Sequence, residues 1–409
     1  MKKIFLYAYD RINFGDDLFI RTICSRYPKV KFYIWSKKYN EKVFSDVKNL
    51  KVLDQKSKFL TTLQKVHPSL YPRYKSKIEK KCDAVVYIGG SIFIEYDNWK
   101  QILNWWDYEA LNRKFYILGA NFGPYKTEEY KDKLASILNN TQDVCFRDKY
   151  SYNLFSDVKK VRYAPDILFN YDYEKKEIKK QIFISVIDCL SRNSGLDKLC
   201  NKEDAYINLL LKYVQRYVTK GYTVILSSFC KMENDEEMVS KIVSKTNIDI
   251  RKSVKVLNYD GVNTEDIIKA IAESELIIAS RFHATVLGLA LNKPVLPVVY
   301  SDKTINILQD LSFNGKYIDV RNLDESSYID SINLDCQIIK DVYNIKVNAN
   351  NITSKVEKGD MGSYVTQYYN NVLVAFNNSS KYVQISAGQI AIYNGEVTAK
   401  GKRAVFDQN

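Results

Sequence analysis

Short apolar, β-branched and aromatic runs alternate with longer amphipathic stretches along most of this chain, and the pattern occurs twice. In the first series the expected strands are Lys3–Tyr9, Lys31–Trp35, Ala84–Ile88, Phe115–Leu118 and Asp143–Phe146. Near-continuous apolar runs of this length are typical of strands buried on both faces of a parallel sheet. The expected helices between them include Asp16–Arg26, Trp99–Asn112 and Glu128–Leu138. Such alternation predicts a doubly wound α/β sheet.

The pattern restarts after Lys180. Its expected strands are Ile182–Ile187, Thr223–Ser227, Val254–Leu257, Leu276–Ala279 and Val295–Val299. Its expected helices lie near Asp204–Val218, Asp235–Val243, Thr264–Ala272 and Ala284–Leu291. The charged segment Asn170–Lys180 lacks apolar periodicity and separates the two series. We therefore expect an α/β protein with two Rossmann-like, doubly wound domains, residues 1–170 and 181–320, that face a cleft.

The last part of the chain, residues 321–409, is expected to form a C-terminal extension. Lys303–Asp310 has a helical pattern just before it, and Ser363–Phe376 is expected to form a terminal helix that packs back on the protein. Val383–Ser386 and Gln389–Tyr393 have the composition of strands. The sequence does not place this tail, residues 381–409, relative to the two domains.

The net charge of +13 arises from lysines that occur in nearly every segment, mixed with acids. Nucleic-acid-binding proteins usually concentrate their charge on one arm, helix or stripe, so we expect no nucleic-acid partner. A basic surface also suits anionic substrates or an anionic membrane face. Seven cysteines without C-x-x-C spacing, and no signal peptide after Met1, favour a cytoplasmic protein, with peripheral association at the inner membrane face left open. No metal site is expected from the spacing of His, Cys and acidic residues.

A basic cluster follows the expected strand Leu276–Ala279. Ser280 is positioned to cap the helix that starts near His283, which would turn free backbone donors and the positive end of the helix dipole toward an anion. Arg281 adds a fork of donors suited to phosphate or carboxylate. Lys303 follows the next strand, and a right-handed parallel crossover places it at the same sheet edge as His283. The sequence therefore predicts an anion site.

The first half contributes further candidate residues. Each of them follows an expected strand, and ligands bind beyond the carboxyl ends of the strands in such sheets. Arg147 supplies a cation, while Asp16 and Asp17 either take part in chemistry or favour the start of a helix electrostatically. Glycines at strand ends allow a ligand to approach the backbone. There is no G-x-G-x-x-G or P-loop motif, which weighs against a dinucleotide or P-loop site. The remaining candidates are Asn13, Gly15, Gly89, Gly90 and Asn121.

The order of these elements resembles the polysaccharide pyruvyl transferase family, which is similar in overall plan to GT-B glycosyltransferases. The resemblance covers about residues 4–312. Two departures are Ser91 where relatives often have a third glycine, and Phe282 where they often have leucine. The matching segments are N-F-G-D-D at Asn13–Asp17, I-G-G-S at Ile88–Ser91, G-A-N-F-G-P at Gly119–Pro124, F-R-D-K-Y-S at Phe146–Ser151, A-P-D at Ala164–Asp166, S-R-F-H-A at Ser280–Ala284, K-P at Lys293-Pro294 and Y-S-D-K at Tyr300–Lys303.

The resemblance implies phosphoenolpyruvate as the donor and co-substrate, no cofactor, and a sugar or lipid-linked oligosaccharide as the acceptor. Two sugar hydroxyls would receive pyruvate as a cyclic ketal, and phosphate would be released. His283 is the expected proton shuttle, and Asp16 or Asp17 would accept a hydroxyl proton or hold the sugar. The expected donor ligands are Arg147, Ser280, Arg281, His283 and Lys303, and the expected acceptor-side residues are Asn13, Gly15, Gly89, Gly90 and Asn121.

Two alternatives remain open from the sequence. A GT-B-like glycosyltransferase would share the fold and use a nucleotide sugar, because fold alone does not determine chemistry. A non-catalytic protein that binds a glycan or an anion would share the fold as well. Arg147, Arg281, His283 and Lys303 weigh against the second alternative, and the lack of a clear ribose-binding acid in the second half weighs against the first.

Overall fold

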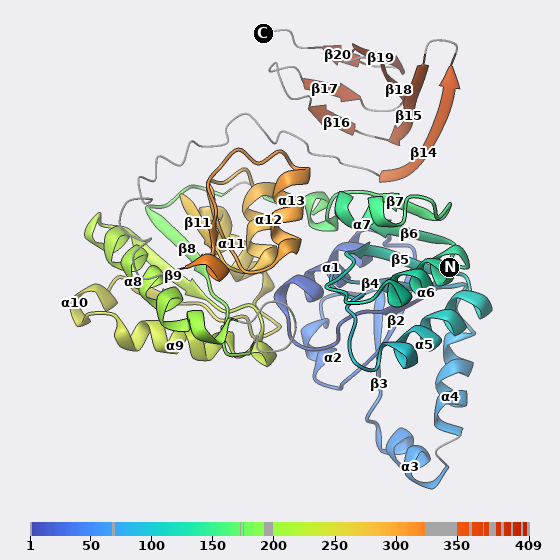
Figure 1. The fold of residues 1–409 in the computed structure, drawn as a ribbon, viewed down its shortest axis with the longest axis horizontal. Helices are drawn as coiled ribbons and strands as arrows, with labels where there is room; N and C mark the ends of the chain where they lie inside the picture. Colours follow the sequence, from blue (N-terminus) through green and yellow to red (C-terminus); the bar gives the residue numbers. More distant parts are fainter. Residues whose placement is uncertain are drawn as a thin grey trace.

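A computed structural model describes residues 2–67, 70–171, 173–174, 176–191 and 199–323, together with strands between residues 350 and 406 (Figure 1). The first half forms a seven-stranded sheet of order β3-β2-β1-β4-β5-β6-β7, in which all pairs are parallel. The strand order reverses between β1 and β4. The strands are β1 (Lys3–Tyr7), β2 (Lys31–Ser36), β3 (Leu50–Asp54), β4 (Ala84–Ile88), β5 (Phe115–Ala120), β6 (Asp143–Phe146) and β7 (Val161–Tyr163).

Helices cover both faces of this sheet because successive side chains of each strand point to opposite faces. In β1, Phe5 packs in one core cluster with Trp106, whereas the next residue, Leu6, packs in another with Phe14. The helices are α1 (Phe14–Arg26), α2 (Asn40–Val43), α3 (Lys58–Val66), α4 (Leu70–Glu79), α5 (Trp99–Asn112), α6 (Glu128–Asn139) and α7 (Lys149–Leu154), followed by the short 3-10 helix η1 (Ile167–Asn170).

The second half forms a six-stranded parallel sheet of order β10-β9-β8-β11-β12-β13, which reverses between β8 and β11. Its strands are β8 (Gln181–Ser185), β9 (Thr223–Ser227), β10 (Val254–Val256), β11 (Leu276–Ala279), β12 (Val295–Val299) and β13 (Ile318–Asp319). Its helices are α8 (Glu203–Thr219), α9 (Asp235–Lys245), α10 (Ile248–Arg251), α11 (Thr264–Glu273), α12 (Phe282–Ala290) and α13 (Asp302–Asp310), with 3-10 turns η2 (Cys200–Lys202), η3 (Lys231–Glu233) and η4 (Val320–Asn322). The predicted pair of doubly wound sheets is confirmed.

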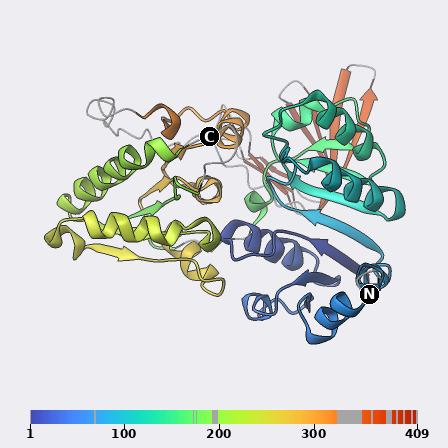
Figure 2. The same cartoon turned by 60° about the horizontal axis from the view of Figure 1, so that its bottom comes forward.

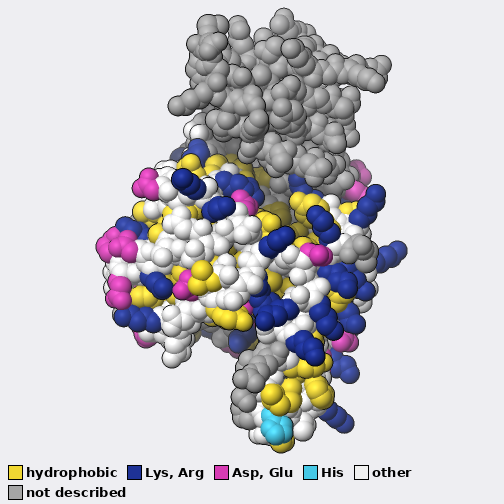
Figure 3. Space-filling model, turned by 90° about the vertical axis from the view of Figure 1, so that its right-hand side faces the viewer, with side chains coloured by type: hydrophobic (Ala, Val, Ile, Leu, Met, Phe, Trp, Pro, Cys, Tyr) yellow, Lys and Arg dark blue, Asp and Glu magenta, His cyan; other side chains and the backbone are white. Residues whose placement is uncertain are grey.

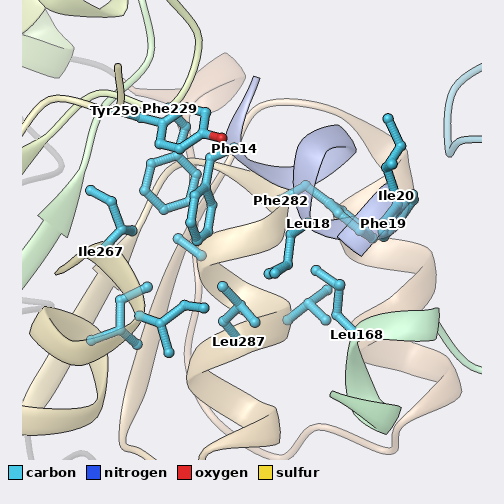
Figure 4. Close-up of a cluster of buried hydrophobic side chains, with 14 of the residues drawn as sticks. Phe14, Leu18, Phe19, Ile20, Leu168, Phe229, Tyr259, Ile267, Phe282 and Leu287 are labelled. Carbon is cyan, nitrogen blue, oxygen red and sulfur yellow. The ribbon is translucent and has the colours of Figure 1, made fainter. Parts of the chain in front are cut away.

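One hydrophobic core joins the two halves, as Figure 4 shows. The ring of Phe14 in α1 lies 4.6 Å from that of Phe229 and 5.2 Å from that of Tyr259, both of which belong to the second half. The backbone N–H of Phe14 also donates to the carbonyl of Phe229 at 2.9 Å, and Asn13 forms a β-bridge with Cys230. Figure 2 shows α1 at the boundary between the two sheets. The N-terminus of α1 is therefore fixed against the second half.

The C-terminal extension contains two antiparallel sheets, β14-β15-β18-β19 and β16-β17-β20. The predicted helix at Ser363–Phe376 is wrong, because β15 and β16 cover residues 362–370 and 372–375, while Phe376 lies outside the described residues. This segment is rich in tyrosine and valine, which favour strands. The two predicted strands of the tail, Val383–Ser386 and Gln389–Tyr393, overlap β17 and β18, and Ser386 lies outside the described residues. The strands are β14 (Asn350–Gly359), β15 (Gly362–Asn370), β16 (Val372–Ala375), β17 (Tyr382–Ile385), β18 (Gly388–Tyr393), β19 (Glu396–Gly401) and β20 (Ala404–Phe406).

Candidate functional site

The points at which the two strand orders reverse lie against each other. In doubly wound sheets, ligands bind beyond the carboxyl ends of the strands at such points. Gly15 follows β1 in the first sheet, and His283 follows β11 in the second. A Cβ atom on Gly15 would lie only 1.6 Å from Nδ1 of His283, so the imidazole rests directly on the backbone of the first half. Two residues from opposite halves of the chain thus form one site.

His283 is enclosed and electrostatically disfavoured as a cation. Its ring makes edge contacts with Phe19 at 5.1 Å and Phe282 at 5.2 Å between centroids. Its Nε2 atom is buried and has no hydrogen-bond partner within the described part of the chain. Burial lowers the pKa of His283 well below its ordinary value, and the positive charges of Arg147, Lys303 and Arg281 lower it further. The imidazole is therefore neutral at pH 7 in this state.

Arg147 is a buried, preorganised cation at the end of β6. Its guanidinium donates from Nη1 to Asp166 at 2.9 Å and from Nη2 to Asn121 at 2.6 Å, which uses two of its five N–H groups. A Cβ atom on Gly90 would lie 2.3 Å from Nη2, so only glycine leaves room for the guanidinium there. The guanidinium also lies over the ring of Phe282, 4.0 Å from its centroid. Arg147 is thus held by both halves of the protein.

Lys303 approaches the same aromatic ring from the second half. It lies in the first turn of α13, and its Nζ atom is 5.8 Å from the ring centroid of Phe282 and 5.4 Å from that of Tyr300. Cations interact favourably with aromatic rings at such distances. Phe282 therefore has a cation from each half beside it, and both cations act electrostatically on His283. The structure brings together the predicted Arg147, His283 and Lys303.

The two adjacent carboxylates of α1 point to different surroundings. Asp17 is buried, and the hydroxyl of Tyr259 donates to its Oδ2 atom at 2.8 Å. Burial raises the pKa of Asp17 to about 8. Asp16 is half-buried instead, and burial raises its pKa to about 7, against the opposing effects of Arg147 and Lys303. Asp16 thus faces the cations, and Asp17 faces the hydrophobic core that joins the two halves.

The prediction that Ser280 caps a helix is wrong. Helix α12 starts at Phe282, and no side chain caps it through the preceding residue, Arg281. The hydroxyl of Ser280 instead accepts a hydrogen bond from Tyr206 at 2.7 Å. Ser280 is buried, and its backbone N–H is bonded to the carbonyl of Ser185 at the end of β8, which holds the segment in an extended form.

Arg281 forms ion pairs with two acidic residues that follow β9. Its Nη1 atom lies 2.5 Å from Oε2 of Glu233, and its Nη2 atom donates to Asp235. A buried guanidinium requires such partners because an unpaired buried charge is very costly. The charge of Arg281 is therefore largely neutralised by Glu233 and Asp235.

Comparison with known proteins decides the family. Residues 13–302 match the model of a family described as polysaccharide pyruvyl transferase. This chain belongs to that family. The amylovoran biosynthesis protein AmsJ of Erwinia amylovora is 20% identical over 321 residues, which cover 71% of this chain and 76% of AmsJ. Pyruvyl transfer in polysaccharide biosynthesis is thus the class of reaction to which the chain is assigned.

Solved structures of similar fold are more distant from this pyruvyl transferase family member. HepE of Anabaena in complex with UDP and glucose has a TM-score of 0.47 and 12% identity, and the match covers 78% of this chain and 85% of HepE. The UDP-GlcNAc 2-epimerase of Neisseria meningitidis bound to UDP-GlcNAc has a TM-score of 0.48 and 11% identity, covering 76% of this chain and 91% of the epimerase.

The glycines and amides predicted on the acceptor side mostly support other site residues. Asn121 holds Arg147, and Gly90 makes room for it. Asn13 caps α1 by accepting from the N–H of Gly15 at 3.1 Å. Gly89 joins the end of β4 to Gly90 and has an extended backbone conformation. In this pyruvyl transferase family member these residues therefore determine where the cations and α1 lie.

Several contributors to the site were not among the predicted residues. Asp166 is fully buried against Arg147, although its A-P-D motif was visible in the sequence. Phe282 lies within the basic cluster itself, yet its contact with two cations was not expected. Glu233, Asp235 and Tyr206 carry no sequence signal that links them to Arg281 or Ser280, because they come from distant segments. Across the described ranges, no three His, Cys, Asp or Glu side chains are grouped to hold a metal ion.

Proposed function

We propose that this protein is a ketal pyruvyl transferase that moves pyruvate from phosphoenolpyruvate onto two hydroxyls of a sugar and releases phosphate. The acceptor would be a cell-surface polysaccharide or its lipid-linked repeat unit. The observation that carries this proposal is the pair of cations, Arg147 and Lys303, that approach Phe282 from opposite halves beside His283. Membership of the family and the similarity to a protein of amylovoran biosynthesis support it.

Two separate cations suit a donor with two anionic groups. Phosphoenolpyruvate carries a phosphate and a carboxylate, and each charge-assisted hydrogen bond contributes about 1.5–3 kcal/mol. Arg147 and Lys303 would bind these groups directly. Arg281 would contribute its positive charge to the site without contacting the donor, because its guanidinium is already paired with Glu233 and Asp235. Ser280 would position the chain through Tyr206.

The reaction transfers two protons from the sugar hydroxyls, one to the methylene carbon and one to the phosphate. The first sugar hydroxyl adds to the central carbon of the enol ester and loses its proton, while the methylene carbon gains a proton and becomes a methyl group. The second hydroxyl then attacks the same carbon and loses its proton as the carbon–oxygen bond to phosphate breaks. The leaving phosphate takes up one proton, so the two hydroxyl protons account for the new methyl hydrogen and for the proton on the released phosphate.

His283 and Asp16 would carry these protons. Burial lowers the pKa of His283 most, and the cations lower it further; an anionic donor would neutralise the cations and so favour uptake of a proton that the imidazole could deliver to the methylene carbon. Asp16, with a pKa raised to about 7, would accept a hydroxyl proton at neutral pH. Asp17 would hold α1 against the second half through Tyr259 rather than react.

The test is phosphate release from phosphoenolpyruvate, with and without candidate acceptor sugars. Lys303→Ala should raise the KM for phosphoenolpyruvate by about tenfold or more, whereas the matched control Lys269→Ala, at an exposed site on α11, should leave it unchanged. His283→Ala should retain donor binding and lose most turnover. Turnover of a nucleotide sugar without use of phosphoenolpyruvate would refute the proposal.

A further inference from the structure

Helices α3 and α4 form a projecting hairpin with an unusual surface. Figure 1 shows the hairpin extending beyond the rest of the first half. It begins at the carboxyl end of β3, the edge of the sheet that also carries Asp16 and Gly90. Its base is anchored, because Leu60 is buried in the core and Glu79 accepts from the indole of Trp35 at 2.9 Å. The hairpin is therefore a fixed part of the protein with an exposed outer surface.

The outer surface of the hairpin carries an apolar patch. Phe59 and Val66 on α3 are 59% and 62% exposed, and Leu70 and Tyr74 on α4 are 41% and 38% exposed. The rings of Phe59 and Tyr74 are in edge contact at 5.3 Å between centroids, so the two helices present one continuous patch. Figure 3 shows hydrophobic side chains gathered at the end of this projection. Clusters of exposed apolar side chains are typical of surfaces that bind another protein, a ligand or a membrane.

The same hairpin holds much of the net charge of the protein. Residues 55–82 contain seven lysines and one arginine but a single acid, so these 28 residues carry +7 of the total of +13. That acid, Glu79, is buried and paired with Arg113 at 3.0 Å, so it does not offset the surface charge. Lys56, Lys58, Lys65 and Lys77 are exposed. The net charge is thus more concentrated than the scattered lysines suggest.

We propose that the α3–α4 hairpin docks the protein on an anionic lipid bilayer. Side chains such as Phe59 and Val66 would enter the boundary between headgroups and acyl chains, and the surrounding lysines would bind the anionic headgroups. A nucleic acid would also attract lysines, but it offers no apolar phase for Val66 and Leu70. Among the helices of the described residues, none combines the length and the apolar character that crossing a bilayer requires.

Docking would deepen the proposed function, because a docked enzyme would meet a lipid-linked acceptor at the membrane surface. The encounter with a lipid-linked acceptor rests on the proposed function. Docking itself does not, and it can be measured without any turnover.

The experiment is co-sedimentation of the full chain with phosphatidylcholine vesicles that contain phosphatidylglycerol. The protein should bind these vesicles, bind pure phosphatidylcholine less, and dissociate as salt is raised. Phe59→Ser with Val66→Ser should weaken binding about tenfold or more. The matched control, Ile248→Ser with Val256→Ser, changes residues of the second half that are 66% and 50% exposed and should leave binding unchanged.

The charge is tested in the same way. Lys58→Glu with Lys65→Glu should weaken vesicle binding by about fivefold or more for each lysine, since each contributes about 1 kcal/mol near such a surface. Lys220→Glu, at an exposed site of the second half, is the control. Equal binding by all variants would overturn the proposal. Loss of single-stranded RNA binding in the lysine variants, with vesicle binding insensitive to Phe59 and Val66, would indicate a nucleic-acid surface instead. Release of phosphate with a water-soluble acceptor should be the same in hairpin variants and wild type.

Discussion

Gly15→Ala tests whether the contact between the two halves positions His283. Gly15 lies in the first turn of α1 with helical backbone, so alanine fits the local conformation and has the higher helix propensity. The added Cβ would nevertheless lie 1.6 Å from Nδ1, 2.2 Å from Cε1 and 2.3 Å from Cγ of the imidazole. Non-bonded heavy atoms require about 3.5 Å, so the ring or the helix must move by about 2 Å.

The surroundings of the imidazole leave little freedom for that movement. Phe19 and Phe282 pack against its ring, and overpacking of this kind costs about 1–3 kcal/mol of stability. A displacement of about 1 Å at a reacting group can reduce a rate about 100-fold. We therefore expect Gly15→Ala to lower kcat for phosphate release from phosphoenolpyruvate by about 100-fold or more, with a fall in the free energy of unfolding of a few kcal/mol at most.

The control is another crowded glycine, Gly288 in α12. A Cβ atom there would lie 2.6 Å from Val295 and 3.4 Å from Ile277, within the core and away from the imidazole. Gly288→Ala should alter the free energy of unfolding in urea by a comparable amount and leave kcat within about threefold of wild type. If Gly15→Ala kept near-wild-type turnover, or both variants lost turnover equally, the positioning role of Gly15 would be refuted.

Three further substitutions test the electrostatics of the site. Asp166→Ala leaves the buried Arg147 without its carboxylate partner and should lower the free energy of unfolding in urea at pH 7 by about 3–5 kcal/mol. Phe282→Leu removes the ring beside Arg147 and Lys303, and should raise the KM for phosphoenolpyruvate about 2–30-fold, because cation–π energies are about 0.5–2 kcal/mol; an unchanged KM would contradict this role. Burial raises the pKa of Asp16 from 3.8 to about 7, so the folded protein holds a proton that the unfolded chain releases, and stability falls as pH rises from about 4 to 7. Asp16→Asn should reduce that slope in urea titrations at several pH values, and the remaining slope should come from Asp17, whose pKa burial raises to about 8. The kcat of the wild type should rise through about pH 7 as Asp16 loses its proton, and the variant should lose that rise; a wild-type slope of stability in the variant would exclude Asp16 as a source.

Parallel topology explains why much of the site could be predicted. Arg147, His283 and Lys303 each come after a strand whose apolar run is plain in the sequence, and the segments that leave parallel strands emerge at one edge of the sheet. The partners of these residues could not be predicted in the same way. Tyr206 approaches Ser280 from α8, 74 residues away, so a sequence rule for caps could not anticipate that the serine hydroxyl would be engaged from another element.

Within the two α/β halves, the strands that sequence analysis missed are the edge strands β3, β7 and β13. Strands β3, β7 and β13 have no fully buried residue, so they lack the continuous apolar runs that identified β1 or β8. The segment Ser363–Phe376 shows the opposite error, because a helix is predicted where the aromatic and β-branched residues favour strands.

The packing of α1 has a consequence for chimaeras between relatives of this protein. By sequence α1 belongs to the first half, but Phe14, Asn13 and Asp17 are bound to residues of the second half. A crossover at residues 170–180, where the two sheets are separated in the chain, would pair an α1 from one parent with Phe229 and Tyr259 positions from another. Exchanging the second half together with α1 should yield a better-packed hybrid, so the unit of recombination in this fold is not a contiguous stretch of sequence.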